Sequence, residues 1–163
     1  MPPVFTAEKV FNTAIKIERN GAAFYAAAAK QTSNEAMKKL FLQLSAAERT
    51  HAQVYVRLKG MILESQKAGK GLETEGILQQ YLHAFAKGGI FNLTMDTVKA
   101  LAEMRSFQEI LEFAIERERD SILFYTAVKE LVPKKLGRSK VDAIIYEEMA
   151  HLATLNQELA RHK

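Results

Sequence analysis

The 163-residue chain contains no cysteine, and it has only three prolines and eight glycines. Without cysteine it can form no disulfide, thiolate zinc site or cysteine-ligated iron–sulfur cluster, which fits a reducing compartment. No segment approaches the roughly 18 consecutive apolar residues that a membrane helix needs. The N-terminal sequence MPPVFTAEKVF also lacks the charged and apolar regions of a secretory signal. We therefore expect a cytoplasmic protein with no membrane contact.

The composition is that of a helical globular protein, with 48% hydrophobic and 26% charged residues. The length suits one domain. The formal net charge is +4, and basic residues crowd the segment 134–140. No nucleic-acid-reading motif accompanies this segment, so we interpret it as ordinary solvated charge and expect no nucleic-acid partner.

Chemically distinctive residues recur at an offset of 100 positions. Residues 14–25 read AIKIERNGAAFY and residues 114–125 read AIERERDSILFY, and Glu48-x-x-His51 recurs as Glu148-x-x-His151. The repeated set of four carboxylates and two imidazoles is Glu18, Glu48, His51, Glu118, Glu148 and His151. The sequence therefore consists of two matched halves, each carrying the same three polar residues.

Each of these six residues falls on a helical stripe of apolar residues, which predicts that it is buried. Burying four carboxylates without counter-charge is costly, and two divalent cations would neutralise them. Glutamate and histidine three positions apart share one helix face, so each ExxH pair can reach the same ion. The sequence therefore predicts a dinuclear metal site. Iron is our expectation because it allows redox chemistry, with manganese or zinc as substitutes.

Apolar spacing and capping signals predict helices at about 6–30, 32–58, 106–131 and 139–161. The expected N-caps are Thr6, Thr32, Ser106 and Ser139. Short loops favour two antiparallel hairpins, at about 6–59 and 106–161, within one domain. The connection at about 60–105 is expected to contain one or two short helices. Because both halves separate their glutamates by thirty positions, a pseudo-two-fold axis should relate the hairpins.

Tyr25 and Tyr125 each follow a repeated glutamate by seven positions. That distance lets the phenol reach a ligand carboxylate or the open side of the site, although ordinary core packing is the alternative interpretation. Phe24 and Phe124 are expected to pack. Two further histidines, His83 and His162, have no partner in the repeat, so we expect them to lie outside the site.

E-x6-Y in the first and third helices, with ExxH in the second and fourth, resembles the ferritin-like superfamily and its rubrerythrin-related branch. The resemblance implies an all-α, ferritin-like four-helix bundle with a long crossover, and the six repeated residues as ligands of two iron ions. Rubrerythrins typically carry a cysteine-rich rubredoxin domain, which is absent here. They also carry a second glutamate where this chain has Ser121. The symmetric six-residue set is closer to the bacterioferritin ferroxidase centre.

The resemblance implies a di-iron oxidoreductase that acts on peroxide or dioxygen. It would need an external electron donor, such as a rubredoxin-like protein, and we expect a homodimer. A ferroxidase of the ferritin type that handles iron, and a bundle merely stabilised by metal, are the two alternatives that the sequence leaves open.

Overall fold

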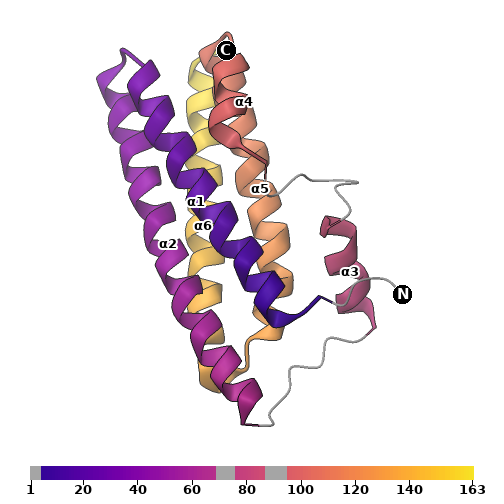
Figure 1. Cartoon of the computed structure of the whole chain (residues 1–163). Helices are drawn as coiled ribbons and strands as arrows, with labels where there is room; N and C mark the ends of the chain where they lie inside the picture. The colour runs from indigo at the N-terminus through magenta and orange to yellow at the C-terminus, as the bar shows by residue number, and fades with distance from the viewer. Residues whose placement is uncertain (1–4, 69–75, 87–94) are drawn as a thin grey trace.

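The computed structural model describes residues 5–68, 76–86 and 95–163. Over these ranges every element of regular secondary structure is a helix (Figure 1). The elements are α1 (Ala7–Gln31), α2 (Glu35–Lys67), α3 (Ile77–Ala86), α4 (Thr97–Glu103), α5 (Phe107–Leu131), the short 3-10 helix η1 (Lys134–Leu136) and α6 (Arg138–Arg161). The prediction of an all-α fold is confirmed.

Four long helices form the bundle, and the two hairpins are evident in Figure 1. Helix α1 packs along α2, and α5 packs along α6. The short helices α3 and α4 belong to the connection between the hairpins, as expected, and residues 69–75 and 87–94 of that connection lie outside the described residues. None of the described helices is both long enough and apolar enough to cross a membrane.

Two of the four predicted N-caps are present. The Thr6 hydroxyl accepts a hydrogen bond from the backbone N–H of Lys9 at the start of α1. The Ser106 hydroxyl accepts one from the N–H of Glu109 at the start of α5. These bonds satisfy backbone donors that the first helical turn leaves without partners, so they fix where the helices begin.

The other two predicted N-caps are wrong. Asn34 caps α2, because its side-chain oxygen accepts from the N–H of Met37 at 3.1 Å, whereas Thr32 ends α1. The cap of α6 is Gly137, with φ of 109°, so Ser139 lies inside the first turn. A left-handed φ suits glycine and disfavours other residues, and this conformational requirement sets the start of α6.

Helix α2 runs to Lys67, beyond the predicted end near Leu58, so the first hairpin and the crossover do not divide at 59/60. Gly60 lies in the helix interior. Leu58 and Ile62, on either side of it, are buried in one cluster with Leu82 of α3. Tertiary packing of this kind outweighs the roughly 1 kcal/mol by which one glycine disfavours a helix.

The core consists of two apolar clusters with a charged layer between them. One cluster holds Phe11 and Leu58 with residues of the C-terminal half of α5 and the N-terminal half of α6. The other cluster holds Phe41, Leu111 and Leu155. Phe24 and Phe124 are both 2% exposed and pack in these clusters, as expected. The charged layer is formed by the six residues that recur in the sequence.

The short helix α4 is fixed to α1 beside this layer. The side-chain amide of Asn20 donates to the Met95 carbonyl at 2.9 Å, and the Thr97 hydroxyl donates to the Asn20 carbonyl at 2.7 Å. The other short helix, α3, is joined to α5, since the Tyr81 hydroxyl donates to the Leu123 carbonyl. The crossover therefore contributes to the surroundings of the charged layer.

Candidate metal centre

All six predicted residues meet in the charged layer, and each long helix contributes at least one of them. Their potential ligand atoms form two groups, within each of which the atoms lie no more than 4.8 Å apart. The groups are Glu18, Glu48, His51 and Glu148, and Glu48, Glu118, Glu148 and His151. Glu48 and Glu148 belong to both groups. These two glutamates could therefore contribute to the binding of both cations of a pair.

Both imidazoles turn their Nδ1 atoms toward the cluster. His51 Nδ1 lies 3.0 Å from a Glu148 oxygen and 3.4 Å from Glu18. His151 Nδ1 lies 2.9 Å from the other Glu148 oxygen and 3.5 Å from Glu48. The same nitrogen of each histidine can therefore bind a cation next to the same glutamate.

Burial and mutual repulsion act against ionisation of the carboxylates. Burial raises the pKa of Glu18 and of Glu118 well above the ordinary value, and the charges of Glu48 and Glu148 raise both further. Burial followed by the charge of Glu148 also raises the pKa of Glu48. These three carboxyl groups need positive charge nearby if they are to stay ionised.

Glu148 differs from the other three. Burial alone would raise its pKa, but hydrogen bonds from His151 and His51 lower it below the ordinary value. Burial opposes protonation of the imidazoles, yet the hydrogen bond and charge of Glu148 raise the pKa of His51 and of His151 to about 9. In the absence of metal, protonated histidines therefore supply part of the missing positive charge.

The donor set fits a pair of divalent cations. Both oxygens of Glu18 and one oxygen of Glu48 are buried and have no hydrogen-bond partner. Such groups are costly unless something else compensates them, and a bound cation would do so. The set is rich in carboxylate and has two imidazoles, which suits iron, manganese or zinc better than soft-ligand metals.

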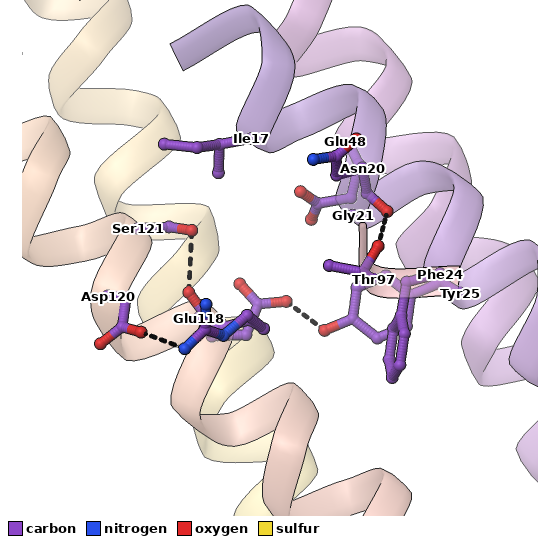
Figure 2. A pocket seen from close by; sticks show the side chains of 11 residues that line it. Ile17, Asn20, Gly21, Phe24, Tyr25, Glu48, Thr97, Glu118, Asp120 and Ser121 are labelled. Atoms are coloured by element: carbon purple, nitrogen blue, oxygen red, sulfur yellow. Dashed lines mark hydrogen bonds and ion pairs between the residues drawn. The ribbon is translucent and has the colours of Figure 1, made fainter. Parts of the chain in front are cut away.

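The two predicted tyrosines, Tyr25 and Tyr125, differ in their hydrogen bonding. The Tyr25 hydroxyl, from α1, donates to Glu118 of α5 rather than to Glu18 of its own half (Figure 2). The Tyr125 hydroxyl is buried without a hydrogen bond, and burial followed by the charge of Glu18 raises the pKa of Tyr125 well above its ordinary value. Each phenol therefore lies close to a glutamate of the opposite half of the sequence, Tyr25 to Glu118 and Tyr125 to Glu18.

Tyr55 is a further aromatic group at the site that we did not predict. It is fully buried in α2, its hydroxyl has no hydrogen-bond partner, and its ring centroid lies 4.9 Å from that of Tyr125. It follows Glu48 by seven positions, the spacing that singled out Tyr25, so the sequence contained the signal. The equivalent position in the second half is Leu155, and the site is therefore not symmetric.

Glu147 was also missed. Its Oε2 lies 2.8 Å from Nε2 of His51, on the side of the ring that faces away from the carboxylate cluster. No spacing argument within a single helix could reveal this contact, because it joins α6 to α2. The remaining histidines lie elsewhere, as expected, with the His83 ring against Phe5 and the His162 ring against Phe107.

A cavity of about 30 Å³ adjoins the charged layer between α1, α4 and α5 (Figure 2). Glu48, Glu118 and Tyr25 are among the residues that line it. A single water needs about 10–15 Å³ measured in this way, so only very small molecules fit. Ser121 lines the cavity too, but its hydroxyl donates to the Arg117 carbonyl and brings no carboxylate to the site.

Asp120 and Arg117 also line the cavity. A guanidinium nitrogen of Arg117 lies 2.7 Å from an Asp120 carboxylate oxygen. The Asp120 side chain is 2% exposed, and this ion pair supplies the counter-charge for its burial. The wall therefore contains one more buried carboxylate than the sequence repeat indicated.

Comparisons with known proteins agree with this geometry. A sequence model of the family described as rubrerythrin matches residues 9–104, more than half of the chain. No curated protein matches. A crystal structure at 2.30 Å resolution, of a protein from Thermotoga maritima provisionally described as a ferritin-like diiron-carboxylate protein, has the same fold, with a TM-score of 0.79, 24% identity and 100% of both chains covered. The chain belongs to the rubrerythrin family and has a ferritin-like fold.

Proposed function

We propose that the protein is a di-iron carboxylate oxidoreductase that reduces peroxide or dioxygen. The observation that supports this proposal is the sharing of Glu48 and Glu148 between two groups of ligand atoms. With Glu48 and Glu148 serving both groups, a bound pair of cations would be able to act on one small molecule together. A site built only to stabilise the bundle would have no need of this arrangement.

Bound as a pair, ferrous ions would supply the two electrons that convert one hydrogen peroxide and two protons into two water molecules, and an external donor would return those electrons. A rubredoxin-type relay needs cysteine ligands, and these 163 residues contain no cysteine. A rubredoxin-like protein is the donor that we propose. A homodimer is the assembly that we propose.

The protein contributes a small opening and a hydrogen-bond donor. The cavity of about 30 Å³ is lined by Glu118, and its volume suits peroxide or dioxygen rather than organic substrates. Tyr25 also lines this cavity and holds its proton against Glu118. Burial, followed by the charge of Glu118, raises the pKa of Tyr25 well above its ordinary value, so the phenol remains a hydrogen-bond donor.

Stopped-flow absorption tests the proposal. Protein loaded anaerobically with two ferrous ions is mixed with hydrogen peroxide and, separately, with oxygenated buffer. We expect at least one oxidant to oxidise the bound iron faster than it oxidises free ferrous iron. If both oxidants react no faster than with free iron, the protein is not an oxidoreductase of this kind, and a structural role for the metal would remain.

A pair of variants on α5 controls this experiment. Glu118→Ala should abolish loading of the second ion and the fast reaction. Glu112→Ala removes an exposed carboxylate from the same helix and should change neither. Retention of two ions with unchanged affinity in Glu118→Ala would contradict the assignment of this residue as a ligand.

Iron handling is the second candidate function. It is favoured by Ser121, which stands where typical rubrerythrins carry an extra carboxylate and whose hydroxyl is bonded to the backbone. Assembly state distinguishes the two functions. A hollow shell of many subunits that retains oxidised iron would support storage, whereas a small oligomer that turns over peroxide repeatedly would support the oxidoreductase.

A further inference from the structure

The two histidines of the centre match on one side of their rings and differ on the other. Both present Nδ1 to the carboxylates. On the far side, Nε2 of His51 lies 2.8 Å from the Glu147 carboxylate. The residue 100 positions before Glu147 is Ala47, which has no polar side chain to offer His151. The six candidate ligands are therefore repeated in both halves, whereas, among the described residues, the carboxylate that contacts Nε2 of the histidine is present only for His51.

Glu18 and Glu118, which each belong to only one of the two groups, also differ in their hydrogen bonds, and the difference favours the group of Glu18. Neither oxygen of Glu18 accepts a hydrogen bond of ordinary geometry, and the nearest donor, Nδ1 of His51, lies 3.4 Å from one of them. One oxygen of Glu118 already accepts the Tyr25 hydroxyl. The His51 side chain is also more deeply buried than that of His151, at 2% against 14% exposed. Three contrasts thus favour the group that contains Glu18 and His51.

A carboxylate behind a metal-binding histidine has a defined effect. An Nε2–H that donates to Glu147 fixes the tautomer with the lone pair on Nδ1, holds the ring in place and makes Nδ1 a better ligand. Removing such a partner commonly weakens metal binding about 10- to 100-fold. The Glu147 side chain is 56% exposed. Water screens it, so we expect an effect near the lower end of that range.

We propose that Glu147 is a positioning residue for His51 and makes the two metal positions unequal. The position formed with Glu18 and His51 fills first and holds its ion more tightly. The position formed with Glu118 and His151 holds the more exchangeable ion, and Glu118 lines the cavity whereas Glu18 and His51 do not. This inference rests on the metal-binding part of the proposed function and does not depend on its oxidation chemistry.

Calorimetric titration of the metal-free protein with Co²⁺ tests the inference. We expect two ions to bind, the first at least about tenfold more tightly than the second. Glu147→Ala and Glu147→Gln should both weaken the first step, by about tenfold for the alanine variant and less for glutamine, which keeps an acceptor. The second step should keep its affinity in both variants.

The repeat offers a reciprocal variant. Ala47 is the position from which a carboxylate would reach His151 if the two halves correspond, so Ala47→Glu should tighten the second step. Glu158→Ala removes one negative charge from the same helix as Glu147, and it should leave both steps unchanged. This variant separates a specific contact from a general change in charge.

Proton NMR of the cobalt-loaded protein gives a readout specific to the histidine. The Nε2–H of a cobalt-bound imidazole appears as a shifted, exchangeable resonance. The resonance of His51 should persist in the parent protein, because the proton is held by Glu147. It should broaden through exchange with water in Glu147→Ala, while the other ligand resonances remain.

The outcomes separate this inference from the proposed function. If Glu147→Ala leaves both steps unchanged, or weakens them equally, Glu147 does not position His51 and the inference is overturned. If the protein binds no pair of ions, the inference and the di-iron proposal both fail. Unequal steps that depend on Glu147, in a protein that reacts with neither oxidant, would support the inference and refute only the oxidoreductase.

Discussion

Gly21 shows how strongly the candidate metal centre depends on single residues. It lies in α1 one turn after Glu18 and lines the cavity beside Glu48. A Cβ atom at this position would come within 3.0 Å of a Glu48 oxygen and 3.4 Å of its Cγ atom. Glycine is otherwise unfavourable inside a helix, so its presence here reflects the space that the shared carboxylate of Glu48 needs.

Gly21→Ala should therefore separate folding from metal binding. In the metal-free protein, higher helix propensity should offset the displacement of Glu48, and the free energy of unfolding should change by less than about 1 kcal/mol. Affinity for the metal pair should fall at least about tenfold, because a carboxylate shared by both ions is displaced. Denaturant unfolding and metal titration measure the two effects. Unchanged affinity for both ions would show that Glu48 does not bridge them.

Helix α2 shows what local signals reveal about an element and what they do not. Its start is set by a side chain, Asn34, that lies two positions from the threonine that we predicted. Its end is set by packing, since Ile62 is buried beyond Gly60. A glycine after an apolar stripe ordinarily indicates the end of a helix, and burial of Leu58 and Ile62 in one apolar cluster favours the continuation of α2.

The glycines at positions 60 and 137 should respond oppositely to alanine. A Cβ at Gly60 meets nothing within 4 Å, so Gly60→Ala should raise the free energy of unfolding by about 0.5–1 kcal/mol. Gly137 has φ of +109°, and its Cβ would lie 3.0 Å from a Leu58 methyl, so Gly137→Ala should lower that energy by more than 1 kcal/mol. Urea unfolding measures both. A loss of stability in Gly60→Ala would mean that α2 is not a continuous helix there.

In the whole molecule, a layer of four carboxylates and two histidines separates two apolar clusters. Apolar burial holds each end of the bundle together. In the middle, burial and repulsion oppose folding unless positive charge compensates the carboxylates. Metal binding and folding are therefore expected to be coupled throughout the bundle, because every long helix contributes to the layer.

Removal of metal should lower the thermal stability of the whole bundle. One ion at a free concentration 100 times its dissociation constant contributes about 2.7 kcal/mol, which corresponds to about 5–11 °C in Tm for a protein of this size. Calorimetry before and after treatment with a chelator measures the shift, and added Mn²⁺ should restore Tm. Glu118→Ala should show a smaller shift than Glu158→Ala. Equal Tm values with and without metal would contradict the coupling.

The helical class, the two hairpins and the six residues of the charged layer were all predictable from the sequence. Helical periodicity assigns each residue to a face of its own helix, and two copies of one spacing make a chance pattern improbable. It could not determine which residue of another helix that face would meet. Helix packing is what brings Tyr25 to Glu118, Tyr55 beside Tyr125, and Glu147 to His51. These contacts join separate helices, and their geometry depends on how the whole bundle packs.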